Sequence, residues 1–150
     1  MTEYLDKLNQ LDQELKVAPV HQQVQEINQI VQIIEQKEVV SKAIKPLGIL
    51  PDQFEDIISQ IGENKRQKLK IMNHLLNGLR QYLSLRFGIW SLPNLQTAEL
   101  LKTELDLSTA LEIMAGNAYW SKALQEVGIQ TVATDSLEWA KTSKTGQNFF

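Results

Sequence analysis

Apolar residues recur at intervals of three and four along most of the chain up to residue 105, and this spacing limits the fold more than any other feature. In the first segment they run from Leu5 to Leu15, which places them on one face of a helix. Pro19 and Pro51 interrupt the pattern, because proline disfavours a helical conformation in the residue before it. The pattern predicts a helical leader over residues 1–107. Its helices are expected at about 2–16, 20–45, 52–61, 63–87 and 95–105.

Two of the expected helices carry a long apolar stripe. The stripe from Val20 to Ile34 is either a coiled-coil seam or one face of a helical hairpin. We favour the hairpin, because the stripe breaks at Glu38 and a coiled coil needs about three to four sustained heptads. The second stripe runs from Leu69 to Leu83, and we expect the two helices to bury these faces on each other.

Composition excludes several kinds of site. The chain has no cysteine, which rules out disulfides, thiolate metal sites and a cysteine nucleophile. Its two histidines, His21 and His74, lie on different expected helices, and no acidic residues complete a metal-binding spacing around them. We therefore predict no metal site, and we expect both histidines to be structural or solvated.

Charge and hydropathy indicate the class of partner and the location. The net charge of −3 would repel phosphate backbones, and the one basic segment, residues 65–70, has the pattern of a solvated helix face. No run approaches the roughly 18 apolar residues of a membrane span. The first segment lacks the apolar middle of a signal peptide. We therefore expect a cytoplasmic protein with no membrane partner and no clear nucleic-acid partner.

The apolar pattern changes after residue 108. Residues 109–114 form a short apolar run, which suits a buried parallel strand apart from one acid. Residues 115–118 are small or turn-forming. Residues 119–127 return to helical spacing, and residues 130–134 have the pattern of a second strand. The order strand, loop, helix and strand is that of the start of a nucleotide-binding α/β sheet.

Each part of this unit carries residues suited to a nucleotide ligand. The small residues around Gly116 let a ligand approach the backbone closely. The helix that follows presents free amide groups and the positive end of its dipole to the same place. Asp135 stands 19 positions after Gly116, at the end of the second strand, where an acid can accept hydrogen bonds from both ribose hydroxyls.

Residues 112–118, Glu-Ile-Met-Ala-Gly-Asn-Ala, resemble the first sequence motif of the class I S-adenosylmethionine-dependent methyltransferases, in which the pattern is acid-x-Gly-x-Gly-x-Gly. Gly116 retains the middle glycine, while Met114 and Ala118 stand at the other two. The resemblance implies S-adenosylmethionine as the cofactor, with Glu112 helping to hold its amino-acid end through the loop and Asp135 binding its ribose. The cofactor-binding residues that it implies are Glu112, Ala115, Gly116, Asn117, Ala118, Tyr119 and Asp135.

A nicotinamide or flavin dinucleotide fold is the competing interpretation of the same topology. Its fingerprint needs a glycine three positions after the second glycine, where this chain has Tyr119. The carboxylate of Glu112 would also be repelled by a pyrophosphate, so we favour the methyltransferase. Two structural interpretations stay open. Glu112 can be a strand-end acid satisfied by nearby backbone amides, and Asp135 can be an ordinary turn former.

The expected fold is a mainly α leader followed by the start of an α/β Rossmann-like methyltransferase sheet, with residues 108–150 forming its first, incomplete β-α-β unit. The expected function is that of the N-terminal part of a methyltransferase-like protein, without catalysis by these residues alone and with no catalytic residue or methyl acceptor assigned. The alternative is a non-catalytic helical interaction or oligomerisation module, which would bind a helical partner or form a homodimer through the two stripes. Trp90, Trp120 and Trp139 are expected to be core or anchor residues.

Overall fold

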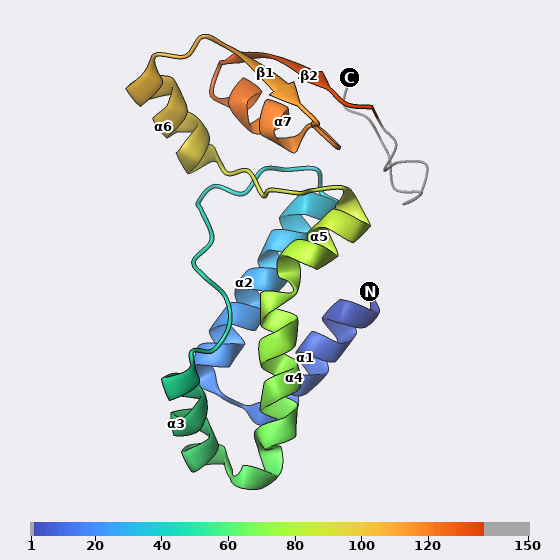
Figure 1. Cartoon of the computed structure of the whole chain (residues 1–150), viewed down its shortest axis with the longest axis vertical. Coiled ribbons are helices and arrows are strands. Elements are labelled where there is room, and N and C mark those ends of the chain that lie inside the picture. Colours follow the sequence, from blue (N-terminus) through green and yellow to red (C-terminus); the bar gives the residue numbers. More distant parts are fainter. Residues whose placement is uncertain (1, 137–150) are drawn as a thin grey trace. The chain divides into compact units, whose positions relative to one another are not determined.

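The computed structural model describes residues 2–136, and over these residues the chain is mostly helical with one small parallel sheet (Figure 1). This confirms the predicted combination of a mainly helical leader and a late pair of strands. Trp139 and the end of the expected 108–150 unit lie outside the described residues. The chain forms two compact units. The first contains residues up to 32 and 45–79, and the second contains residues 33–44 and those from 80 onward.

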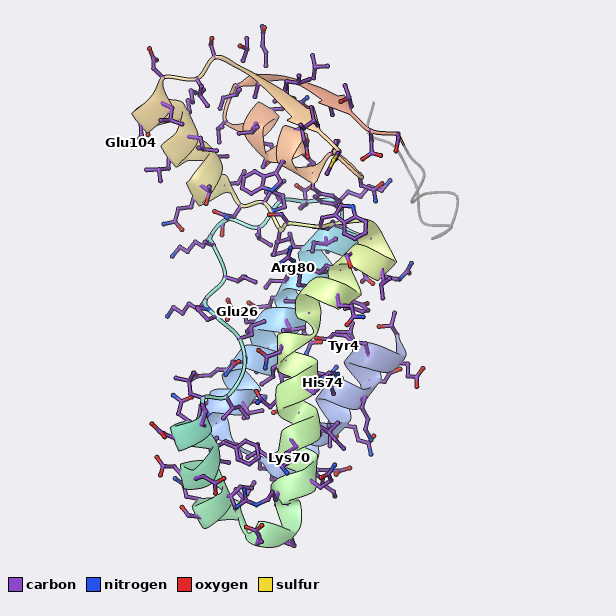
Figure 2. The ribbon with its side chains drawn as sticks, viewed as in Figure 1. Tyr4, Glu26, Lys70, His74, Arg80 and Glu104 are labelled. Carbon is purple, nitrogen blue, oxygen red and sulfur yellow. The ribbon has the colours of Figure 1, made fainter. Side chains whose placement is uncertain are left out.

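The first unit is built from helices whose apolar faces meet. Its elements are α1 (Glu3–Leu15), most of α2 (Ala18–Glu35), α3 (Pro51–Ile61), the short 3₁₀ helix η1 (Glu63–Lys65) and α4 (Arg66–Asn77). α1 packs along α4, and Figure 2 shows Tyr4 turned toward α4, where its hydroxyl donates to the carbonyl of Leu75 at 2.9 Å. Between α1 and α2, the side-chain amides of Asn9 and Asn28 bond each other.

Both predicted apolar stripes are buried in the chain. Most of their side chains are 0–3% exposed, as expected for residues that face a core. These residues are Val20, Val24, Ile27, Val31 and Ile34 on α2, and Leu69, Met72, Leu76, Leu79 and Leu83 on the later helices. A further helix, α5 (Leu79–Phe87), carries the last two.

The expected helix over residues 20–45 is ten residues too long, since α2 ends at Glu35. Lys37 takes a left-handed conformation with φ 60°, its N–H bonds the carbonyl of Ile34, and the N–H of Glu38 bonds that of Ile33. These two bonds form the Schellman pattern that ends helices. The apolar residues beyond it lie outside any helix, and Val40 forms an isolated parallel bridge with Asn94.

The expected helix over residues 63–87 is also wrong as a single element, because η1, α4 and α5 divide it. The break between α4 and α5 lies at Gly78, whose N–H bonds the carbonyl of Leu75 three residues back at 3.0 Å. Glycine is a poor helix former, and this bond tightens the last turn of α4.

The second unit brings the sheet together with elements of the expected leader. It contains α5, α6 (Leu95–Leu105), β1 (Thr109–Ile113), α7 (Tyr119–Glu126) and β2 (Gln130–Thr134). Asn94 is the N-cap of α6, and its side chain accepts the N–H of Thr97 at 2.8 Å. α6 packs on α7. The core of this unit contains Val39, Ala98, Ala123, Leu124 and Ile129. α5 and α6 lie in the same compact unit as the strands. The leader boundary expected at residue 107 stays a prediction.

β1 and β2 pair in parallel, with register from Thr109 opposite Gln130 to Ile113 opposite Thr134. α7 joins the two strands and packs on them. Alternate strand residues are half-buried, whereas the others are exposed on a face that Leu111, Ile113 and Val132 make apolar. The strands therefore place a loop, residues 114–118, and the end of β2 at the same edge of the sheet.

Candidate functional site

The loop between β1 and α7 has a left-handed backbone at every second residue. Met114, Gly116 and Ala118 have φ angles of 52°, 57° and 54°. Only glycine adopts this conformation freely, and other residues are disfavoured there by about 1–2 kcal/mol. These are the three positions at which the methyltransferase motif has glycine. The loop therefore has a backbone suited to three glycines, although the sequence keeps one.

Asp135 lies beside this loop. The N–H of Gly116 donates to its carboxylate oxygen Oδ2 at 2.7 Å, and the N–H of Ala115 donates to the carbonyl of Thr134 at 3.1 Å. The acid at the end of β2 and the remaining glycine are thus direct neighbours at the carboxyl ends of the parallel strands. Ligands of open α/β sheets bind at this edge.

Glu112 faces the helix. Its carboxylate oxygen Oε2 accepts the backbone N–H of Ser121 at 2.8 Å and the Ser121 hydroxyl at 2.6 Å. Ser121 is the third residue of α7, and a side chain at the N-cap usually satisfies its amide. The N-cap here is Ala118, which has no side-chain acceptor, so Glu112 supplies the missing cap from the strand. The acid fixes the start of α7 relative to β1.

The open side of Gly116 is filled by another part of the second unit. A methyl group built on Gly116 would lie 2.7 Å from the carbonyl oxygen of Gly88 and 3.3 Å from Cδ1 of Trp90. Because Gly116 has no side chain, the segment Gly88–Trp90 packs directly against its backbone. Trp90 is one of the expected core or anchor residues, but nothing local in the sequence indicates that it lies against Gly116, 26 residues later.

Asn117 joins the loop to the end of α5. Its side chain is 6% exposed, and its amide nitrogen donates to the carbonyl of Phe87, the last residue of α5. The last carbonyls of a helix need partners from outside the helix, and Asn117 supplies one. Its oxygen Oδ1 has no hydrogen-bond partner among the described residues.

The remaining predicted site residues are buried in the unit. Ala115 and Ala118 are 8% and 2% exposed. The hydroxyl of Tyr119 donates to the carbonyl of Ile34 at 3.1 Å, and burial raises the pKa of this hydroxyl. The side chain of Tyr119 is therefore buried and hydrogen-bonded to the backbone of its own unit. Around the loop, Glu112 and Asp135 thus supply the acidic side chains, and Gly116 supplies the position without a side chain.

Other polar clusters lie in the first unit. His21 Nδ1 bonds Asp12 Oδ2 at 2.6 Å, and within residues 2–136 no three potential metal ligands gather. The guanidinium of Arg66 pairs with Glu55 and Glu63, which lowers the pKa of both carboxyls. The basic segment is thus partly neutralised by its own neighbours. In the described part of the chain, no helix has both the length and the apolar character needed to cross a membrane.

Comparisons of the chain with family models, with curated proteins and with solved structures each find no match. The candidate site therefore stands on its own geometry.

Proposed function

We propose that residues 109–135 form the cofactor-binding unit of a cytoplasmic S-adenosylmethionine-dependent methyltransferase-like protein, at the start of a Rossmann-like sheet. The observation that carries the proposal is the contact between Gly116 and Asp135, whose amide and carboxylate are 2.7 Å apart at the carboxyl edge of the strands. An acid in this place can accept hydrogen bonds from both hydroxyls of a ribose.

The backbone of the loop supports the same proposal. The three left-handed residues, at alternate positions from Met114 to Ala118, keep the course of a loop with three glycines. Met114 is 81% exposed, which favours a side chain directed away from the loop interior. The N-terminus of α7 carries the positive end of the helix dipole, which suits the carboxylate of an amino-acid ligand.

The roles in this proposal differ between the two acids. Asp135 would contact the ribose after releasing the amide of Gly116, which would then be free to bond the ligand. Glu112 would act on the cofactor only through α7, because its carboxylate holds Ser121. We assign no general base, since methyl transfer depends chiefly on aligning the nucleophile with the sulfonium. Catalysis by these residues alone is not part of the proposal.

The alternative function, a helical interaction module, would present the two apolar stripes to a partner. Those side chains are buried in the chain, from Val20 at 1% to Leu83 at 3% exposure. No contact in the described residues favours this alternative, so we retain the cofactor-binding proposal.

The test is calorimetric titration of S-adenosylmethionine and S-adenosylhomocysteine into the wild-type chain and an Asp135→Ala variant. Asp56→Ala is the matched control, because Asp56 is an exposed acid of α3 in the other unit. We expect saturable binding that Asp135→Ala abolishes and Asp56→Ala preserves, with circular dichroism confirming that each chain is folded. Binding that survives in Asp135→Ala would place the ligand elsewhere. The Trp90→Ala chain lacks the indole that lies against Gly116. An absence of binding both by this chain and by the wild type, with both folded, would contradict the proposal.

A further inference from the structure

The segment Gly88–Trp90, called the strap from here on, lies where a ligand of the loop would approach Gly116. The carbonyl oxygen of Gly88 would be 2.7 Å from a methyl group on Gly116, and the indole of Trp90 would touch the same group at 3.3–3.4 Å. Real side-chain carbons do not approach a backbone oxygen so closely, so no atom of a ligand fits between the strap and Gly116. This face of the loop is closed.

The two ends of the strap are held differently. At its start, Gly88 turns left-handed with φ 66°, its N–H bonds the carbonyl of Ser84, and Ile89 is buried. At its end, Trp90 is 51% exposed, and Nε of Arg80 reaches its carbonyl at 3.3 Å. Half of the indole is already in water, so its outward movement exposes less apolar surface than movement of a core residue. The start of the strap is therefore buried, whereas its half-exposed end is held at the Trp90 carbonyl by the single contact from Arg80.

We propose that the strap is autoinhibitory and that an adenosyl amino acid binds the loop by displacing the strap, the Gly88 carbonyl together with the Trp90 indole, from Gly116. The inference rests on the proposed function, since it concerns access to the same site. A ligand that binds only the open form has its apparent affinity reduced by the fraction of chains that are open. The wild-type chain thus binds more weakly than a chain whose strap lacks the indole.

The contact itself is tested without ligand, by acrylamide quenching of Trp90 fluorescence in a Trp120→Phe, Trp139→Phe background. Gly116→Ala places a methyl group against Gly88 and Trp90, so quenching of Trp90 is expected to increase. Gly128→Ala is the matched control, because Gly128 is also left-handed at φ 86° but faces only the flexible Nζ of Lys102 at 3.3 Å. Equal quenching of Trp90 in the two variants would show that the strap does not contact Gly116 in solution, which would overturn the proposal.

The autoinhibition is tested by calorimetric titration of S-adenosylhomocysteine into wild-type, Trp90→Ala and Trp90→Phe chains. If about nine-tenths of the wild-type chains are closed, Trp90→Ala binds about ten-fold more tightly, and Trp90→Phe falls between them. Leu85→Ala controls for loss of an exposed apolar side chain from α5 and is expected to bind like the wild type. Saturating ligand is also expected to increase acrylamide quenching of Trp90 in the single-tryptophan chain.

The outcomes separate the two proposals. Weaker binding by Trp90→Ala would make Trp90 a ligand contact, which overturns the autoinhibition and keeps the proposed function. Equal binding by wild type and Trp90→Ala, with unchanged quenching, would also overturn the autoinhibition alone. No binding by any folded variant, together with increased quenching in Gly116→Ala, would keep the strap contact but refute both its inhibitory role and the proposed function.

Discussion

Replacing Met114 with glycine is expected to stabilise the protein, although it removes a large side chain. Relief of the left-handed conformation raises the free energy of unfolding by about 1–2 kcal/mol. The greater freedom of glycine in the unfolded chain lowers it by about 0.4–1 kcal/mol. Full burial of a methionine side chain contributes roughly 1.5–3 kcal/mol to stability. Because Met114 is 81% exposed, its removal loses only about a fifth of that contribution. The net gain is about 0.5 kcal/mol for Met114→Gly by these contributions.

Met114→Ala isolates the backbone contribution. Alanine loses the same contacts but keeps the left-handed strain, so this variant is expected to be less stable than wild type and about 1 kcal/mol less stable than Met114→Gly. Urea unfolding followed by tryptophan fluorescence measures the difference, because Trp90 and Trp120 both belong to the second unit. With a slope of about 1–3 kcal/mol per molar urea, the two midpoints differ by about 0.5 M. A glycine variant no more stable than the alanine variant would refute the left-handed assignment of residue 114.

Three further predictions concern side chains. Tyr119 has a higher pKa in the folded chain than in the unfolded one, so its contribution to stability is complete below a pH of about 10 and falls as the pH rises through the folded pKa. In urea titrations at pH 8–11, Tyr119→Phe is therefore expected to lose less unfolding free energy at alkaline pH than the wild type does. An unchanged pH profile would contradict this. Glu112→Ala is expected to cost about 1–2 kcal/mol of unfolding free energy through the lost cap, against less than about 0.5 for exposed Glu104→Ala; equal costs would exclude the capping role. Arg66→Gln is expected to raise the pKa of Glu63 toward its ordinary value in a carboxyl NMR titration, and no change would show that the pair does not form in solution.

The helices could be predicted wherever the determinants are local. The three-four spacing identified the buried faces of α2 and α4, and the helix expected at about 52–61 matches α3 closely. The end of α2 was not predicted, because further apolar residues, Val39 and Val40, follow the break of the stripe at Glu38 and extend the expected helix. Val40 instead pairs with Asn94, a partner 54 residues away.

The site shows the same division between local and distant determinants. The order of small residues, helix and final acid predicted that Gly116 and Asp135 lie at one site. In the structure they bond each other, whereas their role toward a cofactor stays a prediction. The occupation of the open side of Gly116 depends on Gly88 and Trp90, which no spacing connects to the loop. The left-handed conformation of Met114 was equally hidden, because methionine does not favour it.

The exposed face of the two strands affects how the protein behaves in concentrated solution. Natural edge strands commonly carry lysine, proline or an inward-pointing charge that prevents pairing with another chain. β1 and β2 contain neither lysine nor proline, and the one charge, Glu112, is bound to Ser121 on the helix side. Leu111, Ile113 and Val132 are 63–69% exposed, and within residues 2–136 no third strand pairs with either edge of the sheet. Strand addition between molecules is therefore the expected route to aggregation, and it would increase with protein concentration.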